Sequence, residues 1–353
     1  MRDKGARTIV HERRSERSEE FLAEVARAYY ERGLTQEQVA GQFGVSRSQV
    51  SRYLSEARDL QIVQTRVVPS EARDREAETE LQEHFSHLRR VVVTAAFATN
   101  PLTIRRTIAR GAARLIERLV RPGSTLCFGA GRTLAETVSL LGRRPLGNVT
   151  VVQAMGNAGH EGLHIDYNAI ARGAAEAFDG RAIQINAPAI LGKGARASEL
   201  EASNRQISEA LGLARSADLY VVGIGSVTGD QMYVNTGLIA LEELDRLAEV
   251  GAVGDICGNF FDIDGRPVQG AFRDRLVGIS LADLRRAPLA LACAGGEEKV
   301  PAVLGALRGR LISALVTDEH TARGVLRLMA ERSRHGRGLR AKARPAIAGG
   351  GRP

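Results

Sequence analysis

The chain has 353 residues, of which 44% are hydrophobic, and it carries a net charge of +8 without any tryptophan. This length exceeds that of one small domain and suits a short module followed by a larger one with an ordinary aliphatic core. The charged first twenty residues argue against a signal peptide, and no apolar run approaches the ~20 residues of a membrane span, so we expect a cytoplasmic protein.

The first predicted element is an amphipathic helix over residues 19–32. Its apolar residues recur at helical spacing, so this helix should cover the two helices that follow and complete a three-helix core. The recurring residues are Phe21, Leu22, Val25, Ala26, Tyr29 and Tyr30.

Residues 35–54, TQEQVAGQFGVSRSQVSRYL, contain two helix starts of the same kind. Thr35 can cap the first helix while Gln38 completes a capping box, and Ser46 and Gln49 repeat this arrangement. The accompanying residues are the hydrophobic staples Leu34 with Val39 and Val45 with Val50, and Gly44 at the turn between the helices. Two short capped helices joined by such a turn predict a helix-turn-helix, and an ordinary helical hairpin is the alternative.

The second helix of this motif opens with side chains suited to DNA. Arg can read guanine and Gln can read adenine bidentately, whereas Ser suits either a base edge or a phosphate. A basic residue one turn further on would extend the same face. The predicted DNA-binding residues are Thr35, Gln36, Ser46, Arg47, Ser48, Gln49, Ser51 and Arg52.

Two connecting segments follow the motif. The first has apolar residues around polar ones and predicts a short extended wing that Pro69 ends. Its apolar residues are Ile62, Val63, Val67 and Val68. The second, over residues 70–88, is rich in charge with Leu81 and Phe85 four apart, and it predicts a linker helix suited to pairing with a second subunit.

From residue 89 onward, apolar runs alternate with helical stretches. Buried Val/Leu/Ile runs that alternate with helices predict a doubly wound, mainly parallel α/β sheet covered on both faces. Strands are expected over 90–96, 124–129, 149–155, 181–186, 218–225, 288–295 and 311–318. Helices are expected near 102–120, 132–141, 166–178, 200–214, 240–249, 297–308 and 319–333. The Asp-Gly pair in FFDIDGRPV (260–268) predicts a hairpin.

Loops rich in glycine are expected at the carboxyl ends of the strands, where open parallel sheets bind ligands. They are residues 129–133, 156–159, 223–226 and 295–299. Glycines let backbone N–H groups approach an anion, and Arg132, Thr133 and Lys299 would add polar groups at helix starts. We predict a sugar or sugar-phosphate site, although these glycines could instead serve only tight turns. A dinucleotide site is disfavoured because GAGRTL departs from G-x-G-x-x-G.

Acidic residues and histidines add one further candidate. Asp255 lies among glycines and could accept hydrogen bonds from sugar hydroxyls, whereas Asp262 and Asp264 more simply shape a turn. His160 and His164 lack a third ligand, so we expect no metal, no cofactor and no catalytic group. The three cysteines are expected to be reduced core residues: Cys127, Cys257 and Cys293.

Together these motifs resemble the SorC family of bacterial sugar-responsive transcriptional regulators over residues 19–332. The resemblance covers VARAYYERGLTQEQVAGQFGVSRSQVSRYLSEARDLQIV, GAGRTL, VVQAMGNAG, NAPAIL, VVGIGS, GAVGDICGNFFDIDG and AGGEEKVPAVLGALRGRLISALVTDEHTA. It implies a winged helix-turn-helix followed by an effector domain similar to glucosamine-phosphate deaminases and ribose-phosphate isomerases. It also implies a tetrameric repressor or activator that senses sugars or phosphorylated sugars.

The resemblance adds the region around Met155 to the residues chosen above and supports the others. The predicted effector-binding residues are Gly129, Gly131, Arg132, Thr133, Met155, Gly156, Asn157, Asp255, Gly295, Gly296 and Lys299. Many family members have Trp where this chain has Ala130, which implies a smaller wall beside the ligand here.

Four parts of the chain are therefore expected. They are a helix-turn-helix domain over 1–69, a linker helix over 70–88, an effector domain over 89–333 and a basic, disordered tail over 334–353. Seven basic and no acidic residues from Arg332 onward give the tail most of the net charge, while residues 71–331 carry −1. DNA binding is thus inferred from the motif and not from the overall charge.

The favoured function is a regulator that binds double-stranded operator DNA under the control of a sugar or sugar-phosphate, as a homo-oligomer. An aldose-ketose isomerase or deaminase of the same fold is the alternative, and the fused helix-turn-helix argues against it. A DNA-binding architectural protein would leave the glycine-rich loops unexplained.

Overall fold

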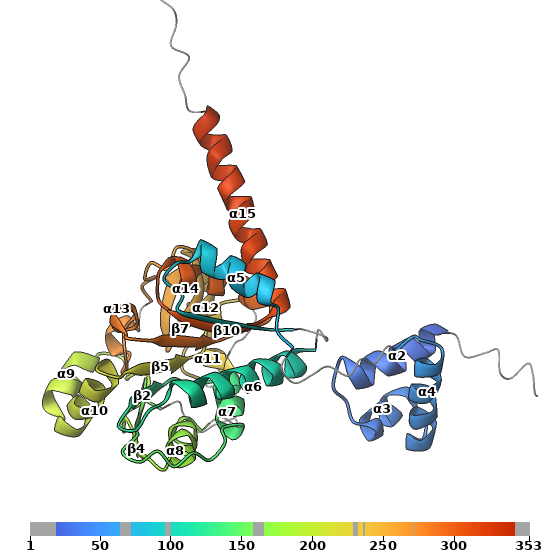
Figure 1. The fold of residues 1–353 in the computed structure, drawn as a ribbon, viewed down its shortest axis with the longest axis horizontal. Helices are drawn as coiled ribbons and strands as arrows, with labels where there is room; N and C mark the ends of the chain where they lie inside the picture. The colour runs from blue at the N-terminus through green and yellow to red at the C-terminus, as the bar shows by residue number, and fades with distance from the viewer. Residues whose placement is uncertain are drawn as a thin grey trace, which may run out of the picture. The chain divides into compact units, whose positions relative to one another are not determined.

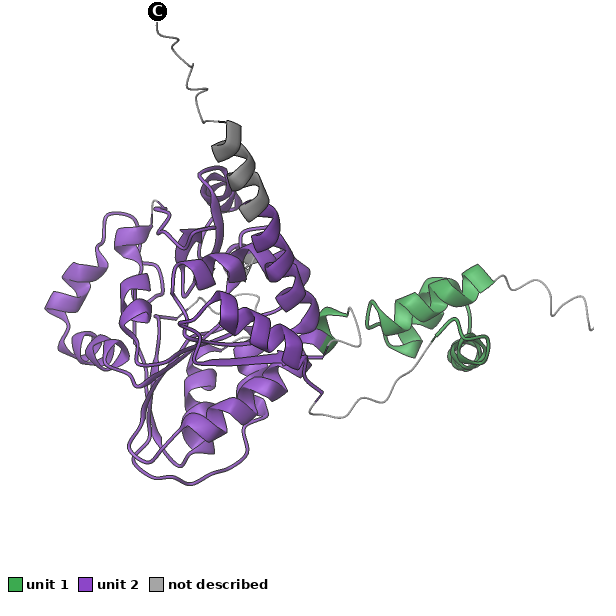
Figure 2. Cartoon of the chain, turned by 45° about the horizontal axis from the view of Figure 1, so that its top comes forward, with its two compact units in different colours: residues 1–70, 97–103 green, residues 71–96, 104–353 purple. Residues whose placement is uncertain are grey.

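The structure is a computed structural model that describes residues 19–63, 72–95, 100–157, 166–228, 232–235, 237–270 and 272–342. It divides into two compact units, shown in Figure 2. Unit 1 comprises residues 1–70 and 97–103, and unit 2 comprises residues 71–96 and 104–353.

Unit 1 is built from three helices around a small apolar core. They are α2 (Glu19–Tyr30), α3 (Gln36–Phe43) and α4 (Arg47–Asp59). Val25, Val39 and Val50 are fully buried between them, and the ring of Phe21 packs edge-on against that of Tyr53. The predicted three-helix core is confirmed.

Both helix starts have the predicted capping boxes. The Thr35 hydroxyl accepts from the Gln38 backbone N–H at 3.3 Å, and the Gln38 side chain accepts from the Thr35 N–H at 2.9 Å. Ser46 and Gln49 repeat the pair at 3.2 and 2.9 Å. Gly44 has a φ of 66°, a left-handed conformation that favours glycine. These local bonds explain why two such short helices begin where they do.

The segment after α4 is described only in part. Ile62 and Val63 pack against the three-helix core, and the Val63 N–H donates to the Ala57 carbonyl at 2.9 Å. Residues 64–71 lie outside the described residues, so the wing that was expected there stays a prediction.

Unit 2 is organised around a seven-stranded sheet whose order is β1-β10-β9-β5-β2-β3-β4. Every neighbouring pair in it is parallel. The strands are β1 (Arg90–Thr94), β2 (Thr125–Phe128), β3 (Thr150–Gln153), β4 (Arg181–Ile183), β5 (Leu219–Val222), β9 (Ala290–Cys293) and β10 (Ala314–Asp318). All seven predicted strands are confirmed, each within the predicted range, as is the parallel α/β fold class.

Helices cover both faces of this sheet (Figure 1). One face packs against α6 (Pro101–Leu119), α7 (Arg132–Ser139) and α8 (Tyr167–Ala177). The other packs against α5 (Arg75–His84), α12 (Leu241–Glu249), α13 (Leu281–Arg286), α14 (Val300–Arg308) and α15 (Glu319–Lys342). Each face of the sheet and its helices enclose one buried apolar cluster, and successive strand residues point alternately into the two clusters. Burial on both faces therefore explains the nearly continuous apolar runs in the sequence.

A second, antiparallel sheet was not predicted. It consists of β6 (Gly225–Ser226), β7 (Ala252–Ile256) and β8 (Asn259–Asp262). The turn between β7 and β8 is formed by Cys257 and Gly258, which have φ values of 50° and 77°. Two positive φ angles are what a two-residue hairpin needs, but Cys-Gly lacks the usual Asn-Gly or Asp-Gly signature. The predicted hairpin over 260–268 follows directly, with an antiparallel bridge between Phe261 and Pro267.

Four predicted helices differ in their limits. The linker helix expected over 70–88 is α5, which begins only after Asp74, whose side chain caps it by accepting from the Ala77 N–H, and ends at His84. The helix expected near 200–214 is two, α9 (Ala197–Ser203) and α10 (Arg205–Arg215), because the Asn204 side chain caps a new start by accepting from the Ile207 N–H at 3.1 Å. The helix expected from 297 opens as the 3₁₀ turn η2 (Glu297–Lys299) before α14. The last helix, α15, continues to Lys342, so the expectation of a disordered tail from residue 334 is wrong for residues 334–342, which extend this helix.

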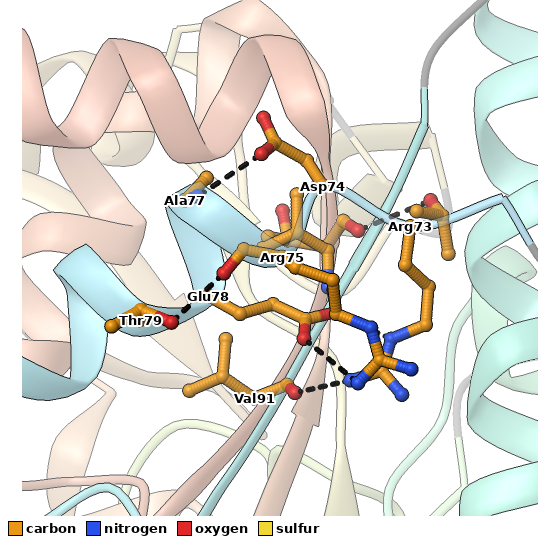
Figure 3. Close-up of polar contacts among 10 residues, drawn as sticks. Arg73, Asp74, Arg75, Ala77, Glu78, Thr79 and Val91 are labelled. Carbon is orange, nitrogen blue, oxygen red and sulfur yellow. Dashed lines mark hydrogen bonds and ion pairs between the residues drawn. The ribbon is translucent and has the colours of Figure 1, made fainter.

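Segment 72–84 joins unit 2 through α5 and the bonds around Glu78. This glutamate is buried, and its carboxylate accepts from the Val93 backbone N–H of β1 at 2.9 Å. The same carboxylate pairs with Arg73 at 2.5 Å, and Arg73 also donates to the Val91 carbonyl at 3.0 Å (Figure 3). These bonds fix α5 against β1, while the expected pairing of this segment with a second subunit stays a prediction.

Candidate functional site

The start of α4 presents a polar face to solvent. Arg47, Ser48, Ser51 and Arg52 are all exposed there. Among the residues that the structure describes, neither Arg47 nor Arg52 forms an ion pair, so both guanidinium groups can contact a phosphate or a guanine edge.

The other predicted DNA-binding residues have a structural role in addition. The Gln49 side chain is half-buried and its amide oxygen holds the Ser46 N–H, while the hydroxyls of Ser46 and Ser48 lie 2.9 Å apart. A side chain that caps its own helix is held in one orientation, so bidentate reading of adenine by Gln49 would compete with the cap. Thr35 caps α3 in the same way, and Gln36 follows it, half-buried.

In unit 2, the predicted ligand loops meet at one edge of the large sheet. From β2 the chain proceeds outward to β3 and β4, and it then returns to β5 on the other side of β2 before reaching β9 and β10. The strand order therefore reverses between β2 and β5, which is where open parallel sheets bind ligands. The loops after β2, β3, β5 and β9 all lie at the carboxyl edge, because these four strands are adjacent and parallel.

Asp255 lies in β7, directly opposite Gly225 of β6. The side chain is only 3% exposed, and one carboxylate oxygen accepts from the Tyr233 hydroxyl at 2.6 Å and from the Gly258 N–H at 2.9 Å. Burial, and then the Asp255 charge, raises the pKa of Tyr233 well above its usual range, so this tyrosine stays a protonated donor. Hydrogen bonds from Tyr233 and Gly258 thus fix the position of the Asp255 carboxylate, the predicted acceptor for sugar hydroxyls.

Cys257 connects Asp255 to the loop after β2. A Cβ placed on Gly129 would lie 3.2 Å from the Cys257 sulfur, which explains a small residue at this position. Burial, and then Asp255, raises the pKa of the Cys257 thiol, so it remains protonated. Gly131, with a φ of 142°, leads into α7, and Arg132 is exposed at the start of that helix.

Thr133 and the glycine before it complete the start of α7. Thr133 is half-buried, and its carbonyl accepts from the Thr137 hydroxyl at 2.7 Å. No side chain caps α7 at Gly131, so its first N–H groups depend on solvent or a ligand.

Residues 155–157 leave β3 in an extended path beside two other loops. Met155 bridges Gly278, and Asn157 bridges Pro188. A Cβ on Gly156 would lie 2.5 Å from the Ala187 carbonyl oxygen, so packing alone requires glycine there. Met155 is buried, whereas Asn157 is half-buried.

An amide cluster holds Asn157 in place. The buried Gln153 donates to Asn168 at 2.8 Å and to Asn157 at 3.2 Å, and it accepts from the Ile185 N–H at 2.7 Å. Amide groups of this kind provide both donors and acceptors, as recognition of a sugar hydroxyl requires.

The two glycines after β9 are required by the fold itself, Gly295 by close packing and Gly296 by its φ of 116°. A Cβ on Gly295 would lie 2.3 Å from Ile108 and 2.2 Å from the Asp318 carboxylate. The Gly296 N–H donates to Asp318 at 3.2 Å and to the Thr321 hydroxyl at 2.8 Å. The tight-turn interpretation therefore accounts for these two glycines without a ligand.

Lys299 is positioned by the same turn. It is half-buried at the end of η2, where its N–H donates to the Gly296 carbonyl at 2.9 Å. The preceding Glu298 carbonyl accepts from the Ser226 hydroxyl at 3.0 Å, which joins this turn to β6. The strand β6, which pairs with Asp255, is thus also bonded to the turn that contains Lys299.

Contacts join most of the predicted effector residues into two separate groups. Gly129 meets Cys257, which neighbours Asp255, and β6 links this group to the turn that contains Lys299. Met155 and Asn157 instead contact the loops at 276–278 and 185–190.

Sequence reasoning missed several polar residues at this edge. They are Gln153, Tyr167, Asn168, Tyr233 and Thr321. Only Tyr167 and Asn168 had a local signal, because they follow Asp166, whose side chain accepts from the Asn168 and Ala169 N–H groups as a helix cap. The other three have no sequence pattern that distinguishes them from ordinary core or loop residues.

Within the described ranges, no three His, Cys, Asp or Glu side chains are grouped so that they could hold a metal ion. His160 and His164 lie outside those ranges. The three cysteines are free and buried, as predicted. None of the described helices is both long and apolar enough to cross a membrane.

Comparison with known proteins defines the class. Residues 70–327 match the family described as "Putative sugar-binding domain". The transcriptional regulator LsrR of Enterobacter sp. (strain 638) is 34% identical over 314 residues, which span 88% of this chain and 94% of that protein. The deoxyribonucleoside regulator of Bacillus subtilis (strain 168) is 29% identical, over 87% of this chain and 97% of its own length.

The solved structures that resemble this chain are also those of transcriptional regulators. The full-length sorbitol operon regulator SorC of Klebsiella pneumoniae matches with a TM-score of 0.67 and 28% identity, over 88% of this chain and 100% of that one. The fold and the matches together define a transcriptional regulator with a sugar-binding effector domain. More particularly, the chain belongs to the SorC family.

Proposed function

We propose that this regulator binds operator DNA through α4 and binds a sugar or sugar-phosphate at the carboxyl edge of the large sheet, between β2 and β5. The observation that carries the proposal is the convergence of Gly129, Asp255 and the Lys299 turn on the point where the strand order reverses.

Charge supports a polar, partly anionic ligand. The exposed Arg132 opens α7, which has no side-chain cap, and Lys299 ends the turn before α14. A phosphate would gain backbone donors and positive charge at such helix starts. Asp255 and the amides near Asn157 would suit neutral hydroxyl groups.

On the DNA side, α4 would enter the major groove with Arg47 and Arg52 towards the duplex. One such helix reads only a few base pairs, so two copies on a pseudo-palindrome would be needed for adequate specificity. We therefore propose a homo-oligomer, a tetramer by resemblance to the family, that acts in the cytoplasm without catalytic activity.

Thermal-shift measurements against sugars and sugar-phosphates test the ligand part. A ligand present at ~100 times its Kd should stabilise the protein by about 2.7 kcal/mol. Incubation of the same compounds with the protein, followed by chromatography, would reveal turnover if the chain were an isomerase or deaminase. Stabilisation by at least one compound without conversion is expected; conversion would favour the enzyme, and stabilisation by none would contradict the proposal.

A further inference from the structure

Tyr167 has a buried hydroxyl group that no described residue hydrogen-bonds. The residue opens α8 and is 6% exposed, and within the described part of the chain its hydroxyl oxygen has no hydrogen-bond partner. Buried polar groups are almost always paired, and an unpaired one is destabilising. A bound ligand could therefore supply the hydrogen bond that this hydroxyl lacks.

The ring of Tyr167 reaches across the carboxyl edge of the sheet. The rest of α8 packs on one face with Ile170 and Ala174, whereas Tyr167 packs with the cluster on the opposite face, which includes Met155 and Cys257. A side chain that begins on one face and joins the other must pass the strand ends. It therefore lies at the edge where the ligand is proposed to bind.

Tyr167 belongs to the same buried cluster as Cys257 and Tyr233. Burial, and then the charges of Cys257 and Asp255, raises the pKa of Tyr167, so its hydroxyl stays protonated. Tyr233 lies in the same cluster, but its hydroxyl is bonded to Asp255 at 2.6 Å. Of these two tyrosines, Tyr167 is the one with its hydroxyl left unbonded.

We propose that the Tyr167 hydroxyl hydrogen-bonds an uncharged hydroxyl group of the sugar effector and so helps to determine which sugar is bound. This inference rests on the proposed function of the edge. A tyrosine hydroxyl both donates and accepts, as a sugar hydroxyl does. The nearby Asp255 carboxylate would repel a phosphate, so the anionic end of a sugar-phosphate faces Arg132 and Lys299 instead.

Tyr167→Phe tests this inference, because it removes one oxygen and keeps the ring. The probes are sorbitol 6-phosphate, fructose 6-phosphate, ribose 5-phosphate and their unphosphorylated forms, titrated calorimetrically into the full-length protein. For the probe that the natural protein binds most tightly, Tyr167→Phe should raise Kd about five- to tenfold, the effect of one lost hydrogen bond. The melting temperature without sugar should not fall, because no bond within the protein is lost.

A matched control is available in Tyr220→Phe. Tyr220 is equally buried, but its hydroxyl interacts with the backbone of Ala217, which precedes β5 at the opposite edge of the sheet. This variant should bind the probe as the natural protein does. Deoxy analogues of the probe then identify the partner, since the analogue that lacks the bonded hydroxyl should bind the natural protein and Tyr167→Phe equally well.

The outcomes separate this inference from the function on which it rests. Equal affinity of Tyr167→Phe and the natural protein overturns the role of Tyr167 and leaves the sugar site standing. A lowered melting temperature without sugar, at unchanged affinity, would assign the hydroxyl to an internal bond through water. Binding of no probe by the natural protein would overturn both.

Discussion

Side chains at the start of α4 divide into those that hold the helix and those left for DNA. Gln49 and Ser46 bond to one another's backbone, whereas Arg47 and Arg52 are exposed. The capping residues could be predicted because their signature is local and spans three positions. The sequence predicted Gln49 both as a capping residue and as a reader of adenine, and the structure shows its side chain in the cap.

We predict that Arg52→Ala weakens operator binding by about 1–3 kcal/mol, the effect of losing one base or phosphate contact. Arg58→Ala is the control, because Arg58 lies in the last turn of the same helix and bonds to Ser55 at 3.1 Å. Gel shifts at fixed salt, on an operator selected from a random duplex library, measure both. Equal effects of the two substitutions would show that α4 does not approach DNA by its first turns.

At the effector edge, the ligand-binding role of each chosen residue stays a prediction. Asp255 was chosen because it lies among glycines, and the structure shows that it is buried and that Cys257, two residues further on, lies close to Gly129. Gly295 and Gly296 were chosen for anion binding, yet close packing against Asp318 already requires Gly295, and a φ of 116° already requires Gly296. Such close approach between segments far apart in the sequence cannot be seen before the fold is known.

Elements of the large sheet were predictable because burial on both faces leaves long apolar runs. The small sheet was not, because β6 has only two residues and the hairpin of β7 and β8 turns at Cys257 and Gly258, which lack the usual turn signature. The break between α9 and α10 depends on one capping residue, Asn204, inside a helical pattern. The sequence therefore did not reveal the small sheet, which depends on packing between distant segments, or the helix break, which depends on one capping residue.

The element that follows the DNA-binding unit, α5, depends on Glu78. We predict that Glu78→Ala lowers the free energy of unfolding by about 3–5 kcal/mol, since it removes the carboxylate that pairs with Arg73 and leaves the buried Val93 N–H without its acceptor. Glu83→Ala, exposed on the same helix, should change it by less than about 0.5 kcal/mol. Urea unfolding of the two variants and the natural protein, monitored by circular dichroism, measures both changes. Similar stabilities of the two variants would mean that α5 is not held through Glu78.

Contacts within unit 2 connect the ligand edge to this same element. The Gly296 N–H is held by Asp318 and Thr321 at the start of α15, and two residues further on Arg323 pairs with Asp74 at 2.7 Å, directly before α5. A ligand that moved the Lys299 turn would therefore act on the segment that leads to unit 1. It can change operator affinity only by binding two conformations of the protein unequally.

At the scale of the whole molecule, the central claim is that sugar binding between β2 and β5 controls operator binding. The most direct measurement is the operator affinity of the natural protein and of Lys299→Ala, each with and without the sugar that gives the largest thermal shift. We predict equal affinities without sugar, and a response that needs at least tenfold more sugar in the variant, because a charge-assisted contact is lost. An unchanged sugar response in Lys299→Ala, or loss of operator binding without sugar, would contradict the claim.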